Sequence, residues 1–505
     1  MTHIRFRLPS AAFPLRWLAI RLAAALAFGV AADWLMVRGM NLSVLVVLAL
    51  VATLVAVFNP VRIGGQRLLL AVAGLAVSLA PLAVDANEVS VLLAMVGVGV
   101  FALALTGQPL RYWPLAGGRA LLLPLAGPVR LLIDLLRVMR LATARRGSRT
   151  PRAGRLAGWL VPVLLLAVFL VLFNMVNPVL ERWLGLLALI RVPDIERFMV
   201  WSALAVLVWP LVHLRVRRTA QAPARGAATG AVHPSGYFGT VPVLRALVLC
   251  NGLFALQTGM DVAYLWGGLA LPPGVTYAAY AHRGAYALIL TVLIAAAFIL
   301  VAARPGGAVS QSRLVRTLVL LWIGQNLALT LSAILRLKIY IEVYQLTYWR
   351  IAAAVWFVLV IFGLLSVVVL VVRGKPLVWL VNRNAAAFAV AMLAGSLANL
   401  PALTAHYNIT HSREVTGKGP ALDVAYLVSL GPQAIPVIDE YLGRIELDLA
   451  RPPADRNSYE HLVESRNRTA VWFPASMTDW RRWSLRDAHL ARYLAGTREA
   501  KVLTR

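Results

Sequence analysis

The stretch of sequence at residues 351–372 reads IAAAVWFVLVIFGLLSVVVLVV, and it contains no charged side chain. Arg350 precedes it and Arg373 follows it, so the apolar run has sharp polar limits. About twenty apolar residues in helical conformation are long enough to cross the hydrocarbon core of a bilayer. We therefore predict a transmembrane helix over Ile351 to Val372.

Comparable apolar segments recur along the whole chain, and the pattern predicts about eleven transmembrane helices. The first could instead be a signal peptide, but Arg21 interrupts its apolar core and favours an uncleaved anchor. The predicted spans are Trp17 to Val37, Leu42 to Asn59, Leu68 to Val84, Val89 to Gly107, Leu156 to Asn174, Phe198 to Leu214, Leu247 to Trp266, Gly284 to Ala303, Leu318 to Leu335, Ile351 to Val372 and Ala385 to Leu403.

Composition agrees with a polytopic transmembrane helical bundle of the all-α class. Of the 505 residues, 60% are hydrophobic and only 14% are charged, which leaves too little polar surface for a soluble globule. A formal net charge of +28 would by itself suggest a nucleic-acid partner. The hydrophobic content overrules that interpretation, and we expect no nucleic-acid binding.

The basic residues are distributed unevenly over the links between the predicted spans. The N-terminus and every second link carry 25 Lys and Arg, whereas the intervening links carry 8. Because basic loops are disfavoured for translocation, the rule predicts a cytoplasmic N-terminus and an extracytoplasmic C-terminal tail. The excess of Arg over Lys suggests a GC-rich bacterial genome, and we expect the bacterial cytoplasmic membrane. The Arg-rich links would contact its anionic inner leaflet.

Four regions follow from this topology: a four-span region at 1–108, a basic interfacial link at 109–155, a seven-span core at 156–403 and an extracytoplasmic helical domain at 404–505. In the link, residues 128–142 have the spacing of an amphipathic helix. In the tail, stripes at 422–430 and 435–449 predict a helical hairpin, and Ser484 can cap a further helix. Trp472, Trp480 and Trp483 could either dock on the membrane interface or pack in a core.

The most polar part of the predicted bundle is the seventh span with the outer link after it. Asp261 and Gln257 lie one helical turn apart, and a carboxylate at this depth is costly unless it faces protein or water. The ninth span and its outer link add further amide and charged side chains. The candidate polar site comprises Asp261, Gln257, Tyr277, Tyr280, His282, Arg283, Gln325, Asn326, Glu342 and Arg350.

Two interpretations of this cluster stay open. Intramembrane ionisable residues commonly bind a substrate, an ion or a lipid headgroup. Alternatively, Asp261, Arg283, Glu342 and Arg350 neutralise one another and hold the helices in register, as buried ion pairs can do. The chain has no Walker loop, HExxH, GxSxG or paired-cysteine motif, so we assign no catalytic residue, cofactor or metal site.

These residues also carry a resemblance to a known family. The chain resembles bacterial multi-pass membrane proteins defined only as a domain of unknown function, from about Val241 to its end. His282 stands where the family pattern suggests a second Arg, and Gln345 where it suggests Gly. The resemblance rests on Asp261, Tyr264, Gly267-Gly268, Leu271-Pro272, Gly274, Tyr277-Ala278, Tyr280-Ala281, Arg283-Gly284, Glu342, Tyr344, Leu346-Thr347, Arg350, Tyr407-Asn408, Asp423, Tyr426-Leu427, Gly431, Ala434, Pro436, Trp480, Trp483 and Ser484-Leu485.

The family implies no activity, so the residues must supply the functional hypotheses. The first is a non-enzymatic scaffold or signalling protein of the cell envelope, whose domain at 404–505 meets a partner protein. The second is a transporter of a small solute or ion that uses Asp261 and Arg283. The third is a lipid-linked sugar transferase, which rests on overall architecture alone.

Overall fold

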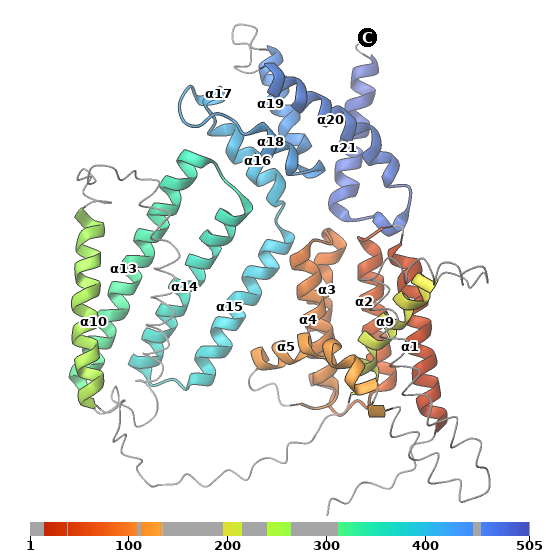
Figure 1. Ribbon diagram of the computed structural model, residues 1–505, viewed down its shortest axis with the longest axis horizontal. Coiled ribbons are helices and arrows are strands. Elements are labelled where there is room, and N and C mark those ends of the chain that lie inside the picture. Colours follow the sequence, from red (N-terminus) through yellow and green to blue (C-terminus); the bar gives the residue numbers. More distant parts are fainter. Residues whose placement is uncertain are drawn as a thin grey trace, which may run out of the picture. The chain divides into compact units, whose positions relative to one another are not determined.

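The computed structural model describes residues 15–37, 39–108, 113–131, 133–134, 195–214, 240–263, 312–447 and 456–503. All regular elements within these ranges are helices (Figure 1). The elements are α1 (Leu15–Met36), α2 (Leu42–Phe58), α3 (Gly65–Val84), α4 (Glu88–Leu105), α5 (Trp113–Leu122), η1 (Pro124–Ala126), α9 (Ile195–Val212), α10 (Thr240–Asp261), α13 (Arg313–Tyr344), α14 (Tyr348–Arg373), α15 (Leu377–Leu397), α16 (Leu400–Thr410), α17 (Arg413–Thr416), α18 (Val424–Ser429), η3 (Pro432–Ala434), α19 (Ile435–Leu447), α20 (Arg456–Ser476), η4 (Trp480–Arg482) and α21 (Leu485–Leu503).

Six described helices are long and apolar enough to cross a membrane: α1, α3, α4, α13, α14 and α15. Three shorter apolar helices, α2, α9 and α10, coincide with further predicted spans. The predicted spans Leu156 to Asn174 and Gly284 to Ala303 lie outside the described residues. The protein is therefore an all-helical membrane protein as predicted, while the count of eleven spans stays a prediction.

The chain divides into two compact units. Unit 1 comprises residues 1–79, 94–109 and 115–216, and unit 2 comprises residues 80–93, 110–114 and 217–505. In unit 1, α1 packs closely along α9, and α2 packs against both. A Cβ added to Gly29 of α1 would lie 2.4 Å from the backbone oxygen of Trp201 in α9. Glycine therefore permits the two helix backbones to touch, as small residues do at many membrane helix crossings.

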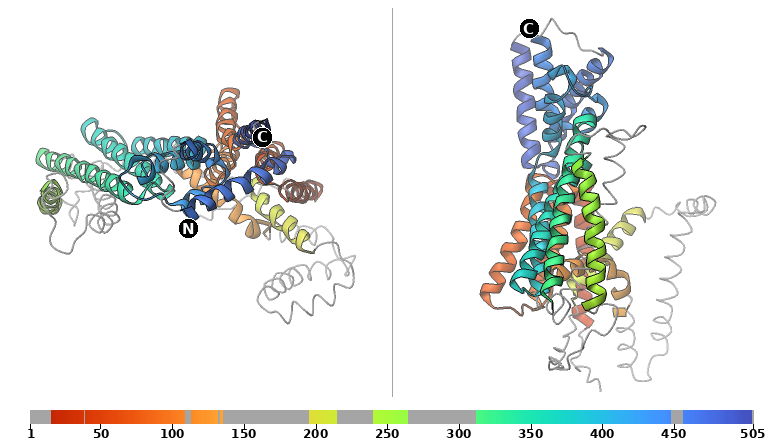
Figure 2. Two further views of the ribbon diagram at one scale, coloured as in Figure 1. Left: turned by 90° about the horizontal axis from the view of Figure 1, so that it is seen from above. Right: turned by 90° about the vertical axis from the view of Figure 1, so that its left-hand side faces the viewer.

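In unit 2, α10, α13, α14 and α15 lie side by side in that order, which both figures show (Figures 1 and 2). Asn251 of α10 bonds to Leu318 of α13, and Phe254, one turn later, contacts Trp322. Residue numbers rise together in these contacts, so α10 and α13 run parallel.

The predicted boundary of the last span is wrong. The apolar run predicted a helix over Ala385 to Leu403, whereas α15 covers Leu377–Leu397 and a new helix, α16, starts at Leu400. The Asn399 side chain accepts a hydrogen bond from the backbone N–H of Ala402, 3.3 Å away, and Pro401 lies in the first turn. An asparagine cap followed by proline starts a helix despite the apolar surroundings.

The regular elements in the described residues after Thr404 are helices, while the limits of the predicted domain at 404–505 stay a prediction. α18 and α19 lie within the two predicted stripes, with η3 between them and Gly431 at a φ of +81° in the connection, but α18 packs mainly on α20 and α19 on α16. Ser484 Oγ accepts from the N–H of Asp487 at 3.1 Å and caps α21, as predicted. Trp472, Trp480 and Trp483 are 48%, 47% and 38% exposed, so the alternative that they are core residues is wrong.

Candidate functional site

The site is built around the short turn that joins α13 to α14. Gln345, in this turn, has a φ of +65°, a conformation that no other described non-glycine residue adopts. Arg350 donates a hydrogen bond to the carbonyl of Tyr344 at 2.5 Å and another to the carbonyl of Gln345. Its guanidinium also lies 4.6 Å from the ring centre of Tyr340. Arg350 thus satisfies carbonyls that the end of α13 leaves unpaired.

The C-terminal domain holds this turn by side-chain hydrogen bonds to its backbone. Asn408 of α16, 2% exposed, accepts from the N–H of Leu346 at 2.7 Å and donates to its carbonyl at 3.0 Å. Gln345 Nε2 donates to the carbonyl of Ala421 at 2.7 Å, and its Oε1 accepts from the N–H of Asp423 at 3.3 Å. The turn and the domain therefore form one continuous hydrogen-bonded structure.

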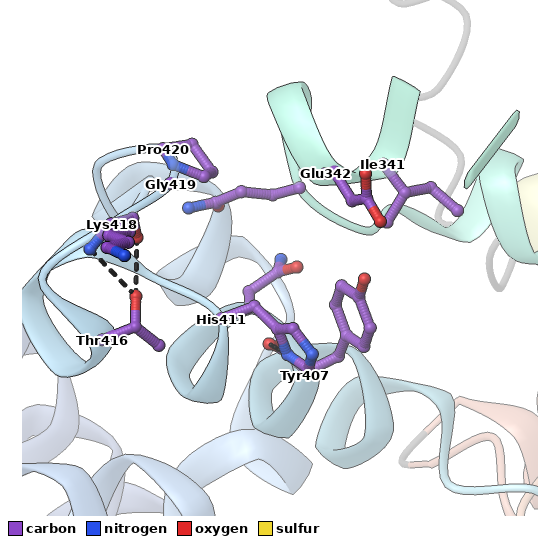
Figure 3. Close-up of a pocket in the computed structure, with 10 residues that line it drawn as sticks. Ile341, Glu342, Tyr407, His411, Thr416, Lys418, Gly419 and Pro420 are labelled. Carbon is purple, nitrogen blue, oxygen red and sulfur yellow. Dashed lines mark hydrogen bonds between the residues drawn. The ribbon is translucent and has the colours of Figure 1, made fainter. Parts of the chain in front are cut away.

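A pocket of about 230 Å³ opens beside this contact (Figure 3). The rings of Tyr407 and His411 stack with their centres 4.1 Å apart and form one wall. In Figure 3 the Tyr407 hydroxyl and the Glu342 carboxylate point toward one another. The lining residues are Ile341, Glu342, Gln345, Tyr407, Asn408, His411, Thr416, Lys418, Gly419 and Pro420.

The electrostatics of the pocket are mixed. Burial, and secondarily the negative charge of Glu342, raises the pKa of the Tyr407 phenol above its ordinary value. Glu342 also forms an ion pair with Lys338, one turn earlier in α13, with 3.7 Å between Nζ and Oε1. Both partners of this pair are more than half exposed, so it contributes little stability. The phenol, imidazole and carboxylate could hydrogen-bond a small polar group.

A second contact fastens the C-terminal domain to helix ends in unit 2. Arg486, in the first turn of α21, forms an ion pair with Asp85, which follows α3. Its other terminal nitrogen donates to the carbonyls of Leu397 and Ala398 at the end of α15, at 3.0 and 3.1 Å. The Arg486 side chain is 10% exposed. A planar guanidinium with several donors can join three such acceptors at once.

The structure describes only part of the predicted polar site. Tyr277, Tyr280, His282 and Arg283 lie outside the described residues, and Asp261 is described only as the last residue of α10. Glu342 and Arg350 lie near the α13–α14 turn, where Glu342 pairs with Lys338 and Arg350 bonds to backbone carbonyls. The predicted ion pair between Asp261 and Arg283 therefore stays a prediction.

The predicted amides Gln325 and Asn326 lie in the middle of α13, which packs against α10 and α14. Asn326 is fully buried and donates to the carbonyl of Trp322 at 2.7 Å, while Gln325 is half-buried. Within the described part of the chain, Oδ1 of Asn326, Oε1 of Gln325 and Oδ1 of Asn251 are buried acceptors without a hydrogen-bond partner. Such atoms are costly in a bilayer unless water or a ligand reaches them.

Sequence reasoning missed the roles of Gln345 and Asn408. Both belong to the family-like pattern, but nothing in their local sequence shows which backbone groups they bind. The sequence did contain one signal for Gln345, since the family pattern favours Gly at this position. A positive φ is the physical reason for a glycine preference, and it marks this turn as unusual.

Substitutions at Gln345 should separate backbone strain from side-chain bonding. Gln345→Ala keeps the unfavourable φ and loses both side-chain hydrogen bonds, so we expect a loss of about 1–3 kcal/mol. Gln345→Gly loses the same bonds but removes the strain, so it should be more stable than Gln345→Ala. Thermal unfolding of the purified full-length variants measures this order. An alanine variant at least as stable as the glycine variant would contradict it.

Comparison with known protein families identifies the family of the chain. A family model described as Domain of unknown function (DUF4153) matches residues 69–441. The expected membership in a family defined only as a domain of unknown function is thereby confirmed, but the matched region begins and ends earlier than the expected Val241 to the C-terminus. No curated protein and no solved structure matches the chain.

Proposed function

This chain belongs to the family of the domain of unknown function DUF4153, and from that premise we propose a non-enzymatic scaffold or signalling protein of the bacterial cytoplasmic membrane. In this proposal the N-terminus is cytoplasmic, the Arg-rich links contact the anionic inner leaflet, and the C-terminal domain binds a partner protein outside the membrane. In this role, the protein would hold its partner at the membrane or transmit a signal from it, and it would not catalyse a reaction.

The observation that carries the proposal is the attachment of the C-terminal domain within unit 2. Asn408 forms two hydrogen bonds with the backbone of Leu346 in the α13–α14 turn, and Arg486 bonds to both Asp85 and the end of α15. These contacts reach the α13–α14 turn, the residue after α3 and the end of α15. The C-terminal domain is therefore attached at three places and does not hang on a single linker. A domain fixed in this way can relay a partner's binding to the membrane helices.

The surface of α20 supports a protein partner. Val471 and Trp472 are adjacent on this helix and are 63% and 48% exposed. Exposed apolar side chains that lie together mark interaction sites in many proteins, and tryptophan is enriched among residues that dominate binding energy.

The test is site-specific photo-crosslinking in the native membrane with the full-length protein. We expect a crosslinkable residue at Trp472 to yield one discrete protein adduct. The matched control is the same residue at Arg444, which is 60% exposed on α19 and should give no adduct. The test compares only the two positions of the crosslinkable residue.

No adduct from Trp472, together with movement of a solute by the purified protein in lipid vesicles, would overturn the proposal and favour transport. The transporter alternative has a specific observation behind it. The unpartnered amide oxygens of Asn251, Gln325 and Asn326 belong to α10, which ends at Asp261, and to α13, which packs against α10. A transported ion or polar solute would supply the missing hydrogen-bond or charge partner.

A further inference from the structure

A second polar cluster lies inside unit 1, and the site described above does not include it. His213 directly follows α9, and its Nδ1 is hydrogen-bonded to Nη1 of Arg21 in α1. On the other side of the ring, Nε2 lies 4.0 Å from Oδ2 of Asp134. The His213 and Asp134 side chains are 8% and 4% exposed. Three ionisable groups distant in sequence therefore meet in a largely buried place.

Neighbouring groups fix both charged partners of His213. Arg21 Nη2 donates to the carbonyl of Phe58 at the end of α2, at 2.7 Å. Asp134 Oδ2 accepts from the indole N–H of Trp209 at 3.2 Å. The Trp209 ring also stacks on the imidazole, with 6.1 Å between ring centres. The imidazole is thus held in one orientation between a cation and an anion.

The hydrogen bond to Arg21 determines which nitrogen of His213 carries a proton. A guanidinium group only donates hydrogen bonds, so the Nδ1 atom that faces it must present a lone pair. The single proton of the neutral ring therefore lies on Nε2, which faces Asp134. In this state, the imidazole is neutral and lies between the positive charge of Arg21 and the negative charge of Asp134.

We propose that His213, together with Arg21 and Asp134, forms a proton-binding site in the membrane-embedded part of the protein. A proton from water binds to Nδ1 of His213, and no other bond is made or broken in that step. The new N–H faces the Arg21 guanidinium, so an accepted hydrogen bond is replaced by repulsion between two cations. The attraction between the imidazolium and Asp134 increases at the same time.

Protonation places a second positive charge beside the Arg21 guanidinium in a largely buried site, which is unfavourable. Protonation should displace α1, because Arg21 connects α1 to the end of α9 and must move away from Nδ1 of His213. Arg21 comes from α1, and Asp134 comes from the helical residues 133–134. Among the other described elements packed on α9, α2 and η1 contain no ionisable side chain, whereas Arg130, four residues before Asp134 in the sequence, is a further cation in this region. Acidic pH should therefore weaken the packing of α1 on α9.

The cluster lies at helix ends. Arg21 is in the second turn of α1, Phe58 is the last residue of α2, and His213 follows the last residue of α9. The hydrogen bonds of Arg21 to Phe58 and to His213 bring these three ends together. Histidine and carboxylate side chains within membrane segments commonly mark proton relays.

The test compares the thermal midpoint of the full-length protein in lipid nanodiscs at about pH 5 and about pH 8, the range in which histidine titrates. His213→Asn keeps an oxygen acceptor for Arg21 but cannot bind a proton. We expect the wild-type midpoint to fall by several degrees at the lower pH, and the fall to be much smaller in His213→Asn. The control His489→Asn changes an exposed histidine on α21 and should keep the wild-type fall. An unchanged fall in His213→Asn overturns the proposal.

A measurement on the wild-type protein covers the case in which His213→Asn does not fold. Nitrogen NMR of histidine-labelled protein distinguishes an imidazole nitrogen with a lone pair from one with a proton. We expect one buried histidine with its proton on Nε2 at pH 8 that becomes doubly protonated on acidification. A buried ring that keeps its proton on Nδ1, or that stays neutral to pH 5, would overturn the proposal.

Discussion

Replacing Arg466 with leucine is expected to destabilise the C-terminal domain by about 3–5 kcal/mol, the range for removing one partner of a buried ion pair. Arg466 on α20 binds Asp439 on α19 through two parallel hydrogen bonds, of 2.7 and 2.8 Å. The two side chains are only 11% and 15% exposed. Without Arg466, Asp439 would keep a charge in a place that water hardly reaches.

A third helix depends on the same carboxylate. Tyr493 of α21 donates its hydroxyl proton to Asp439 Oδ2 at 3.0 Å. Burial, followed by the charge of Asp439, raises the pKa of this phenol to about 12. Arg466, Asp439 and Tyr493 thus connect α19, α20 and α21, so the loss of Arg466 should loosen all three.

Amide hydrogen exchange of the full-length protein measures this prediction locally, since lost stability appears as lost protection in α19, α20 and α21. The matched control is Arg468→Leu, two residues further on, whose partner Glu464 lies one turn earlier. That pair is about 70% exposed, and its loss should cost no more than about 0.5 kcal/mol. Equal losses of protection in the two variants would show that the buried Arg466–Asp439 pair stabilises the domain no more than the exposed Arg468–Glu464 pair does.

Replacing Gly29 with leucine is expected to separate α1 from α9 in unit 1. Even the Cβ atom of alanine would lie 2.4 Å from the carbonyl oxygen and 3.1 Å from the Cα of Trp201. These are backbone atoms, so no side-chain rotation relieves the clash and the helices must move apart. Overpacking of this kind costs about 1–3 kcal/mol for one added group, and leucine adds three more carbon atoms.

The separation would also affect a polar contact one turn further along α1. Asp33 accepts a hydrogen bond from the indole N–H of Trp201 at 2.9 Å, and this bond requires the close approach at Gly29. We expect Gly29→Leu to lower the thermal midpoint strongly and to reduce the amount of folded protein recovered from membranes.

Gly74→Ala is the matched control for this prediction. Gly74 lies in α3, and a Cβ at this position would meet no atom within 4 Å. Alanine has the better helix propensity, so this variant should be at least as stable as the wild type. A Gly29→Leu protein with the wild-type midpoint would contradict the helix crossing described above.

Much of the membrane architecture could be predicted because it depends on local composition. Each apolar run of about twenty residues must hydrogen-bond its own backbone in lipid, so hydropathy alone predicts a helix there. The last span shows the limit of this reasoning. Its apolar run continues to Leu403, but Asn399 and Pro401 start a new helix, and hydropathy does not register a cap.

The candidate site could be predicted only where its residues are close in sequence. Glu342 and Arg350 flank one turn, and the density of polar residues there singled it out. Asn408 reaches the same turn from more than sixty residues away, and Tyr407 and His411 come with it. Neither amphipathic spacing nor charge indicates which distant backbone group an amide side chain binds.

By itself, the sequence determined that this protein is a bundle of membrane helices with a helical C-terminal domain, because the hydrophobic effect and backbone hydrogen bonding act on each segment separately. Only the tertiary structure decided which charges meet. Arg21 and His213 are 192 residues apart, and Arg486 and Asp85 are 401 apart, yet each pair is in direct contact. Such contacts depend on how whole helices pack, and helix packing follows from the shapes of many side chains together.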